Sequence, residues 1–196
     1  MLSQQIPILL GSGSPRRKEY LSRFGLKFEV RSADIDESVW PGEDPWDYVR
    51  RMVAAKAEPF LSEARSGTLV VVADTLVLLE NQILGKPEGP EGVLPMLQRL
   101  NGKSHQVITG YGLYLKDRHL IKEVISRVTF KKSSLDLLAA YAKTTEPLDK
   151  AGAYSIQGLG TCLVESIEGS YNNVVGLPIE ELLADLVDWG VLSPVT

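Results

Sequence analysis

Cysteine is almost absent from this chain of 196 residues, which contains only Cys162. A single cysteine excludes an internal disulfide framework and a cysteine-rich zinc site, and it favours the reducing cytoplasm. The first apolar run, Ile6 to Leu10, contains Pro7 and ends at Gly11. This run is too short for a signal-peptide core or a membrane span, so neither secretion nor membrane insertion is expected.

The chain also lacks an excess of positive charge. It has 21 Lys and Arg against 25 Asp and Glu, giving a formal net charge of -4 at pH 7. A nucleic-acid polymer is bound through many phosphate contacts from a basic face, so such a partner is not expected. A small polyphosphate needs only local cations. The length and the 44% of hydrophobic residues fit a single compact domain over residues 1–196.

Strand and helix signals alternate along the chain, which predicts an α/β class with a mixed, twisted sheet and flanking helices. Ser14-Pro15 and Asp44-Pro45 each combine a capping residue with a proline suited to a first helical turn. Gly25 is expected to end the first of these helices, and Pro59 to end or kink the second. Strands are predicted at 6–10, 69–73, 107–115, 123–132 and 161–167, further helices at 135–143 and 178–189, and a loop at 168–177.

The segment Gly11 to Arg17 places small residues, a helix amino terminus and two guanidinium groups together. Backbone N–H groups and arginine side chains of this kind can converge on phosphate oxygens, so the segment predicts an anion site. It is not a P-loop, because the Gly-Lys-Ser/Thr ending is absent. It is not a dinucleotide fingerprint either, because Arg16 stands where the third glycine would be. The alternative is that Ser14-Pro15 caps a surface helix whose arginines are solvated.

Two further charged residues lie in apolar surroundings. Lys56 shares a helical stripe with Val49 and Phe60, so its stem should follow apolar neighbours while its ammonium reaches toward a cleft. Alternatively, that ammonium extends to solvent. Asp74 follows the unbroken apolar run Leu69 to Ala73 and is expected at the carboxyl end of a strand covered on both faces. Ligands of open α/β sheets bind at such ends, although an aspartate there can also cap a turn.

Asp34, Asp36 and Glu37 form an acidic cluster. This cluster offers hard oxygen ligands for magnesium or manganese, or it is simply a solvated loop. Gly85-Lys86-Pro87 adds a point charge suited to a polyphosphate. His105 and His119 lie at no metal-ligand spacing, and no catalytic role is expected for them.

Five segments follow one another along the chain: Ser12 to Arg17, Ala73-Asp74-Thr75, Gly85-Lys86-Pro87, Lys150 to Gly158, and Gly169 to Pro178. In this order they resemble the Maf family of nucleoside triphosphate pyrophosphatases, and the resemblance spans nearly the whole chain. Motifs that keep a consistent order are far more specific together than any one of them alone. The resemblance implies a fold related to the inosine triphosphate pyrophosphatases, with two lobes around a deep cleft, and a homodimer in many members.

The same resemblance implies the activity and the roles of individual residues. Family members hydrolyse nucleoside triphosphates to monophosphate and diphosphate with a divalent cation, Mg²⁺ or Mn²⁺. By position, Asp74 would be the proton acceptor or a metal-linked carboxylate, and Glu37 a metal ligand. Ser12 would contact phosphate through its backbone or hydroxyl. The cations on the phosphates would be Arg17, Lys56 and Lys86.

Three positions indicate which base is preferred. Arg16, Thr75 and Gln157 match the family members that act on dTTP and UTP, whereas members preferring 7-methyl-GTP have Trp, Gln and Glu there. A Gln amide can donate to O4 of uracil or thymine while accepting from N3–H, and a Glu carboxylate cannot donate to O4. The positively charged ring of a methylated guanine would be repelled by Arg16 in this chain. In members that have Trp at the same position, that ring would stack on the Trp side chain.

Other functions stay open at this point. Modified pyrimidine nucleotides are alternative substrates, in a housecleaning role that removes them before polymerases incorporate them. A 7-methyl-GTP pyrophosphatase is another alternative. The family also resembles proteins linked to inhibition of septum formation, so a nucleotide-binding regulator of cell division is an alternative of a different class.

Overall fold

The computed structural model of the chain describes residues 2–195. Two compact units can be distinguished. Unit 1 comprises the chain up to Asp74, Thr109–Glu123 and the chain from Gly176 onward, and unit 2 comprises Thr75–Ile108 and Val124–Val175. The single domain expected over residues 1–196 stays a prediction.

One mixed sheet contains seven strands in the order β3-β2-β4-β6-β7-β8, with β5 paired to β4. Strand β2 is parallel to β3 and β4, whereas β5 and β8 are antiparallel to β4 and β7. The predicted mixed sheet is therefore confirmed. The strands are β2 (Ile8–Gly11), β3 (Phe28–Arg31), β4 (Leu69–Leu79), β5 (Gln82–Leu84), β6 (Ser104–Leu115), β7 (Arg118–Phe130) and β8 (Val164–Glu168).

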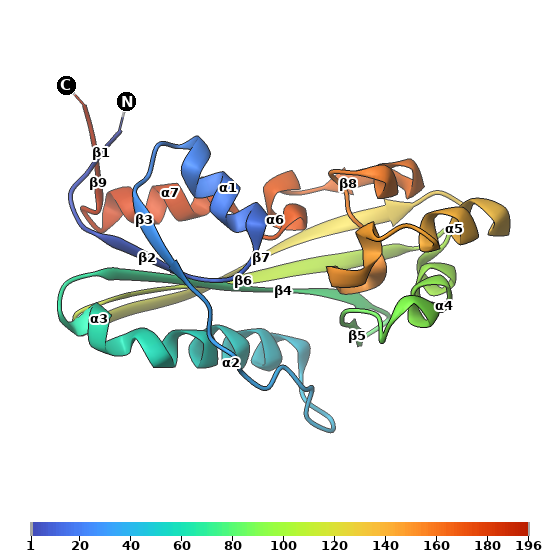
Figure 1. Ribbon diagram of the computed structural model, residues 1–196, viewed down its shortest axis with the longest axis horizontal. Coiled ribbons are helices and arrows are strands. Elements are labelled where there is room, and N and C mark those ends of the chain that lie inside the picture. Colours follow the sequence, from blue (N-terminus) through green and yellow to red (C-terminus); the bar gives the residue numbers. More distant parts are fainter. Residues whose placement is uncertain (1, 196) are drawn as a thin grey trace. The chain divides into compact units, whose positions relative to one another are not determined.

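The helices of unit 1 cover both faces of its strands. Figure 1 shows α1 (Pro15–Arg23) and α7 (Ile179–Asp188) on one side of the strands, and α2 (Pro45–Ala57) and α3 (Leu61–Arg65) on the other. Between α2 and the sheet, Val53 and Phe60 pack with Leu9 and Val72. Two short strands that the sequence did not predict, β1 (Leu2–Gln4) and β9 (Leu192–Pro194), pair with each other near the chain ends.

Unit 2 has its own core, formed by helices α4 (Pro90–Leu100) and α5 (Leu135–Ala142) with the unit's strands. Leu97, Phe130, Leu138 and Tyr154 are among its buried side chains. The sequence did not predict α4, which contains Pro95. The remaining elements are the short helices η1 (Glu58–Phe60), η2 (Glu146–Asp149), η3 (Ala151–Ala153), η4 (Leu159–Leu163) and α6 (Tyr171–Val175).

Most of the predicted helix boundaries are confirmed. Helix α1 begins at Pro15 and is followed by Gly25 with φ +72°, and Pro59 lies in the 3-10 turn that ends α2. The Asp44 side chain caps α2 by accepting from Trp46 N at 2.9 Å. Ser14 occupies the N-cap position of α1, but its side chain accepts no capping hydrogen bond from the described backbone, so that prediction is wrong. The Ser14 N–H instead donates to Ser12 Oγ at 3.3 Å, which organises the loop around Ser12.

The strand that contains Asp74 differs from the prediction. The run Leu69 to Ala73 is buried throughout, as expected, but β4 continues to Leu79 and Asp74 lies inside it rather than at its carboxyl end. The extension follows from the second apolar run, in which Val77 pairs with Leu84 of β5. The segment 168–177 also contains the helical turn α6, where only a loop was expected.

Candidate active site

Two carboxylates of unit 1 converge on one ammonium group. Lys56 Nζ, near the end of α2, lies 2.5 Å from Asp74 Oδ1 and 2.8 Å from Glu37 Oε1. Only 13% of the Lys56 side chain is exposed, and Asp74 is 8% exposed. The alternative in which the Lys56 ammonium extends to solvent is therefore wrong. A lysine ammonium carries three N–H donors, and two of them serve these carboxylates.

Arg17 holds the loop after β2 against β4. The residue is buried, and its Nε donates to Gly176 O at 2.8 Å. Its Nη1 donates to Ala73 O at 2.8 Å and to Ser12 Oγ at 3.1 Å. Burial lowers the pKa of the Arg17 guanidinium, whereas the charge of Asp74 acts in the opposite direction. The alternative of solvated arginines in this segment is wrong for Arg17, because the side chain fixes Ser12 beside the backbone of Ala73.

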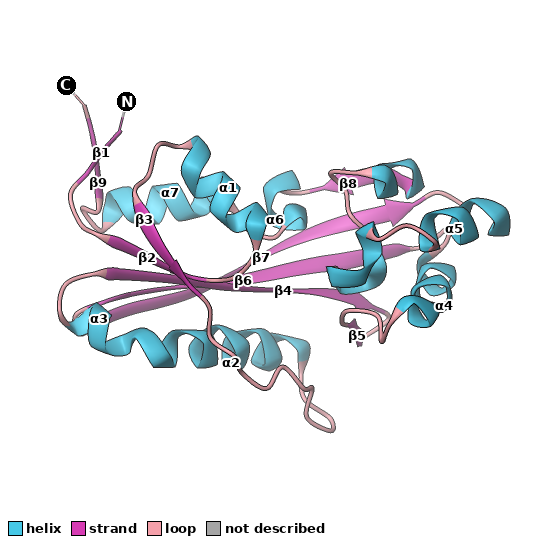
Figure 2. Ribbon diagram, viewed as in Figure 1, coloured by secondary structure: helices cyan, strands magenta, loops and turns pink. Residues whose placement is uncertain are grey.

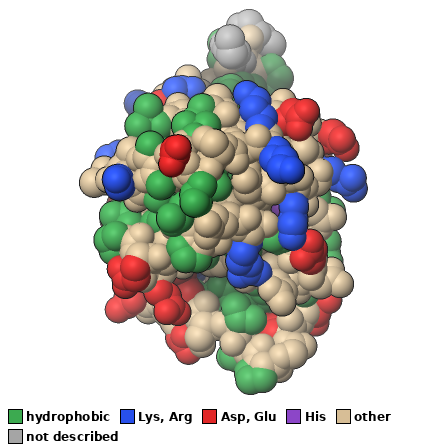
Figure 3. All heavy atoms as spheres, turned by 90° about the vertical axis from the view of Figure 1, so that its right-hand side faces the viewer, with side chains coloured by type: hydrophobic (Ala, Val, Ile, Leu, Met, Phe, Trp, Pro, Cys, Tyr) green, Lys and Arg blue, Asp and Glu red, His purple; other side chains and the backbone are tan. Residues whose placement is uncertain are grey.

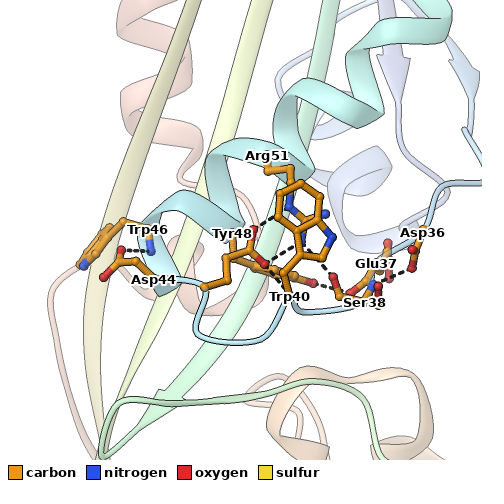
Figure 4. A network of polar contacts seen from close by, with 9 residues as sticks. Asp36, Glu37, Ser38, Trp40, Asp44, Trp46, Tyr48 and Arg51 are labelled. Carbon is orange, nitrogen blue, oxygen red and sulfur yellow. Dashed lines mark hydrogen bonds and ion pairs between the residues drawn. The ribbon is translucent and has the colours of Figure 1, made fainter.

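The loop that carries Glu37 runs from β3 to α2 and has no regular secondary structure (Figure 2). Arg51 of α2 contacts this loop at several positions, as Figure 4 shows. Arg51 donates to both carboxylate oxygens of Glu43, at 2.6 and 2.7 Å, and to Ser38 O at 2.9 Å. The Arg51 guanidinium carbon lies 4.0 Å from the ring centroid of Trp40. The Arg51 side chain thereby contacts the loop at three residues, Ser38, Trp40 and Glu43.

Tyr48 fixes the backbone of Glu37 itself. Its hydroxyl, on the first turn of α2, donates to Glu37 O at 3.0 Å (Figure 4). Burial raises the pKa of the Tyr48 phenol, and the negative charges of Asp74 and Glu37 raise it further. The phenol is therefore a neutral donor near neutral pH. Sequence reasoning missed both Tyr48 and Arg51, since helical periodicity shows which face is apolar but not which side chains reach a neighbouring loop.

The other expected ligands of the acidic cluster do not join this arrangement. Asp36 accepts from Ser38 N at 2.9 Å, and the hydrogen bonds from Ser38 hold the pKa of the Asp36 carboxyl below its usual value. Glu37 is the member of the cluster that reaches Lys56. Across residues 2–195, no group of three or more His, Cys, Asp or Glu side chains is arranged to hold a metal ion. Glu37 and Asp74 are thus a pair of carboxylates rather than part of a complete protein cage.

The remaining expected residues are distributed over the two units. Arg16 lies in α1 of unit 1 and is partly exposed. Thr75 follows Asp74 within β4, and it belongs with Lys86 and Gln157 to unit 2. Lys86 and Gln157 are exposed, and Thr75 is partly buried. In unit 2 the turn carrying Lys86 adjoins the turn after Lys150, because Gly152 N donates to Gly85 O at 3.0 Å.

This arrangement has the elements of phosphate chemistry. The buried carboxylate of Asp74 can orient or deprotonate a water molecule, and the neighbouring cations Lys56 and Arg17 can offset negative charge.

No helix in the described part of the chain is long and apolar enough to cross a membrane. His105 lies in the core of unit 2, where its Nε2 is 2.8 Å from Tyr154 Oη.

Comparison with known proteins gives consistent results. A protein of Geobacter metallireducens described as dTTP/UTP pyrophosphatase is 45% identical over 188 residues, covering 94% of this chain and 97% of that protein. A protein of Nitratidesulfovibrio vulgaris with the same description is 47% identical over 189 residues, covering 95% of this chain and 89% of that protein. One of Clostridioides difficile, also so described, is 46% identical over 177 residues, covering 89% and 91% respectively.

The solved structure of the Staphylococcus aureus Ham1 protein matches with a TM-score of 0.52 and 13% identity, covering 93% of this chain and 99% of that one. At such low identity the likeness shows the fold alone. The expected α/β class, with a mixed sheet and flanking helices, is confirmed, and the fold is shared with this Ham1 protein. The family described as "Maf-like protein" matches residues 7–189, nearly the whole sequence. The chain belongs to the Maf family.

Proposed function

We propose that this protein is a nucleoside triphosphate pyrophosphatase that hydrolyses dTTP and UTP to the monophosphate and diphosphate. The observation that carries the proposal is the Lys56 ammonium held between Asp74 and Glu37, at 2.5 and 2.8 Å, beside the buried Arg17. The full-length similarity to proteins described as dTTP/UTP pyrophosphatases supports it.

In this proposal water attacks the α-phosphorus, and the bond from that phosphorus to the oxygen bridging the α- and β-phosphates breaks. Asp74 orients the water and accepts its proton, and diphosphate leaves with the bridging oxygen. Lys56 directs its third N–H to a phosphate oxygen, and Lys86 adds a second point charge on the phosphates. Arg17 offsets negative charge from its buried position. Such fixed cations stabilise the charge that develops as the bond breaks.

Ser12 is assigned to phosphate binding within the same proposal. Its Oγ accepts from Arg17 Nη1 at 3.1 Å and from Ser14 N at 3.3 Å. Because a hydroxyl has one donor and two acceptor positions, its own O–H is the part suited to a phosphate oxygen. Arg17 would then contribute by holding Ser12 as well as through its charge.

The carboxylates fit a divalent cation, Mg²⁺ or Mn²⁺, as cofactor. Oxygens of Glu37 and Asp74 approach a single cationic group, and both are hard donors. A pair of carboxylates suits Mg²⁺, which usually binds through one or two carboxylates while waters and substrate phosphates complete its shell. When bound, such a cation supplies charge stabilisation at the phosphate oxygens and helps to activate water.

Base selection is assigned to Arg16, Thr75 and Gln157. Gln157 would donate its amide N–H to O4 and accept from N3–H of uracil or thymine. Arg16 would disfavour a positively charged methylated base. Modified pyrimidine nucleotides that keep O4 and N3–H, such as 5-methyl derivatives, would satisfy the same contacts, so a housecleaning role is compatible with the proposal.

The partner proposed for this site is a small nucleotide rather than a nucleic-acid polymer. On the face shown in Figure 3, Lys and Arg side chains stand among acidic and hydrophobic ones, and the net charge of the chain is -4. A polymer binder would present a continuous basic face. A homodimer and a cytoplasmic location complete the proposal. The first is tested by light scattering of the purified protein, and the second by fractionating cells that express it.

The decisive experiment is diphosphate release from canonical and modified nucleoside triphosphates, with magnesium, manganese or chelator. We expect metal-dependent hydrolysis that favours dTTP and UTP, and loss of turnover by about 100-fold or more in Asp74→Asn with nucleotide binding retained. Undiminished turnover in Asp74→Asn would contradict the assigned mechanism. A preference for 7-methyl-GTP would overturn the base assignment. If no nucleotide is hydrolysed, and cells that express Asp74→Asn still stop dividing, the alternative of a nucleotide-binding regulator of cell division would be favoured.

A further inference from the structure

The segment that carries Gln157 in unit 2 is built around one carboxylate. Glu146, at the start of η2, accepts from Leu159 N through Oε2 and from Gly160 N through Oε1, both at 2.9 Å. Its Oε1 also accepts from the hydroxyl of Tyr141 at 2.9 Å. Three donors from two segments therefore meet on the Glu146 side chain, and two of them, Leu159 N and Gly160 N, come shortly after Gln157 in the sequence.

Tyr141 closes the other end of the same loop. Its hydroxyl, at the end of α5, accepts from Ser155 N at 3.1 Å while it donates to Glu146. Tyr141 is only 4% exposed, so its ring is fixed in the core of unit 2. Glu146 and Tyr141 together bind the backbone on both sides of Gln157, at Ser155 and at Leu159 and Gly160.

The glycines of this loop fit the same arrangement. A Cβ added to Gly158 would lie 1.9 Å from Glu146 Oε2, and one added to Gly160 would lie 2.5 Å from Ser155 O and 2.7 Å from Tyr141 Oη. Neither position accepts a side chain without displacing the carboxylate or the phenol. The loop is therefore closed tightly onto these two side chains.

Electrostatics agrees with the geometry. Burial acts to raise the pKa of the Glu146 carboxyl, but hydrogen bonds from Gly160 N, Leu159 N and Tyr141 Oη outweigh it and hold the pKa below its usual value. The carboxylate is thus ionised near neutral pH. Hydrogen bonds to an ionised acceptor are stronger than those between neutral groups, which suits a group that holds backbone.

We infer that Glu146 and Tyr141 are positioning residues for base specificity, which hold the loop Ser155–Gly160 so that Gln157 stays in one place for reading the base. This inference rests on the proposed function, in which Gln157 reads the base. An amide turned over by half a rotation presents the pattern that suits cytosine instead of thymine. A displaced loop lets the amide approach the base in either orientation, so discrimination between dTTP and dCTP should fall when the loop is released, even though neither Glu146 nor Tyr141 needs to touch the nucleotide.

Two substitutions remove the contact from opposite sides. Glu146→Ala deletes the carboxylate, whereas Gly158→Ala keeps the carboxylate but displaces it, because the added methyl group would lie 1.9 Å from Glu146 Oε2. Glu165→Gln is the matched control, because Glu165 is an exposed carboxylate of the same unit, on β8. Glu146→Gln should be intermediate, since a Gln amide keeps one of the two acceptor oxygens.

The measurement is kcat and KM for dTTP and dCTP. We expect both Ala variants to lower the dTTP to dCTP ratio of kcat/KM by about tenfold, mainly through KM for dTTP, because a small misplacement of a recognition group is costly. Glu165→Gln should keep the wild-type ratio. Amide exchange measured without nucleotide should show faster exchange at Leu159 and Gly160 in Glu146→Ala, which is the direct readout of the loop.

An unchanged dTTP to dCTP ratio in both folded Ala variants would overturn the inference, as would unchanged exchange at Leu159 and Gly160. If the wild-type protein releases no diphosphate from any nucleotide, the proposed function fails. The inference is then decided by calorimetric binding of dTTP and dCTP to the same proteins. A binding ratio that drops in Glu146→Ala supports it, and an equal ratio in all variants overturns it.

Discussion

Arg51 binds both carboxylate oxygens of Glu43, at 2.6 and 2.7 Å, and so ties helix α2 to the loop that carries Glu37. Only 21% of the Arg51 side chain and 6% of the Glu43 side chain are exposed, so this ion pair is better shielded than a typical surface pair. The pairing raises the pKa of Arg51 and lowers that of Glu43, which keeps both groups charged.

The first prediction concerns this pair. Arg51→Lys keeps the charge but loses the bidentate contact with Glu43 and the guanidinium whose carbon lies 4.0 Å from the Trp40 ring centroid. We expect Glu37 to become less well placed and the metal concentration for half-maximal activity to rise by about tenfold. Titration of activity with Mg²⁺ measures this. Arg50→Lys is the control, since Arg50 is on the same helix but contacts Asp47 and Glu123 instead. Equal metal requirements in the two variants would refute a positioning role.

The second prediction concerns the charge of Lys56. Lys56→Met should lower the free energy of unfolding by about 3 kcal/mol, because removing Lys56 leaves the buried Asp74 carboxylate without its direct ion-pair partner. Asp74→Asn added to Lys56→Met should recover part of the loss, although neither protein should be active. Urea unfolding of the four proteins of this cycle gives the coupling energy. Strictly additive losses would mean that the pair is not energetically linked.

The third prediction tests base recognition. Gln157→Glu should lower kcat/KM for dTTP and UTP by about tenfold or more, since a carboxylate cannot donate to O4 and would face it as a second acceptor. Relative activity on 7-methyl-GTP should rise, because guanine offers N1–H and N2–H donors. Competition between the nucleotides measures the ranking directly. Gln98→Glu introduces the same charge at an exposed position of α4 and should leave the ranking as it is. A ranking that Gln157→Glu also leaves intact would remove Gln157 from the specificity site.

The sequence predicted the parts of the fold that depend on local signals. Pro15, Gly25 and Pro59 act through their own backbone geometry, so the boundaries they mark are confirmed. The end of β4 was missed because the polar Asp74 interrupts two apolar runs that form one strand, and pairing with β5 continues beyond it. Helix α4 was missed because it contains Pro95, and proline inside a segment argues against a helix.

The site shows the same division. Motifs indicated Ser12, Arg17 and Asp74, and helical periodicity indicated Lys56. No local signal indicates that Lys56 lies between Asp74 and Glu37, which are far apart in the sequence. The supporting residues were out of reach for the same reason. Tyr141 and Glu146 lie near the end of a helix, where such residues are common, so nothing in the local sequence marks them. Their proposed role depends on the loop of residues 155–160, which folds back onto them.

The fourth prediction concerns Asp185, which is 5% exposed on α7 in unit 1. It accepts from the fully buried Tyr111 hydroxyl at 2.5 Å and pairs with Lys122. Asp185→Leu should cost about 1–3 kcal/mol of stability, because the Tyr111 hydroxyl loses its partner. Tyr111→Phe made in that background should cost little more. Asp188→Leu, at an exposed position of the same helix, should change the free energy of unfolding by less than about 0.5 kcal/mol. A large further loss from Tyr111→Phe in that background would contradict this account.

The fifth prediction is a pH dependence of stability that originates in the core of unit 2. Burial lowers the pKa of His105 from 6.5 to about 4, and the ring lies edge-on to Phe130 and Tyr154. Since the unfolded chain binds this proton more readily, stability is fully present above pH 6.5 and is lost as the pH falls toward 4. The shift corresponds to about 3 kcal/mol.

Carboxylates titrate in part of the same range, so the contribution of His105 must be isolated by difference. His105→Gln keeps a neutral polar group at every pH, and we expect its stability to fall less steeply than that of the wild type between pH 6.5 and 4. Urea unfolding across this range measures both curves. His119→Gln is the control, because His119 is exposed in β7 and its removal should leave the wild-type slope intact. Parallel curves for His105→Gln and the wild type would show that His105 takes up its proton in the folded state as easily as in the unfolded chain.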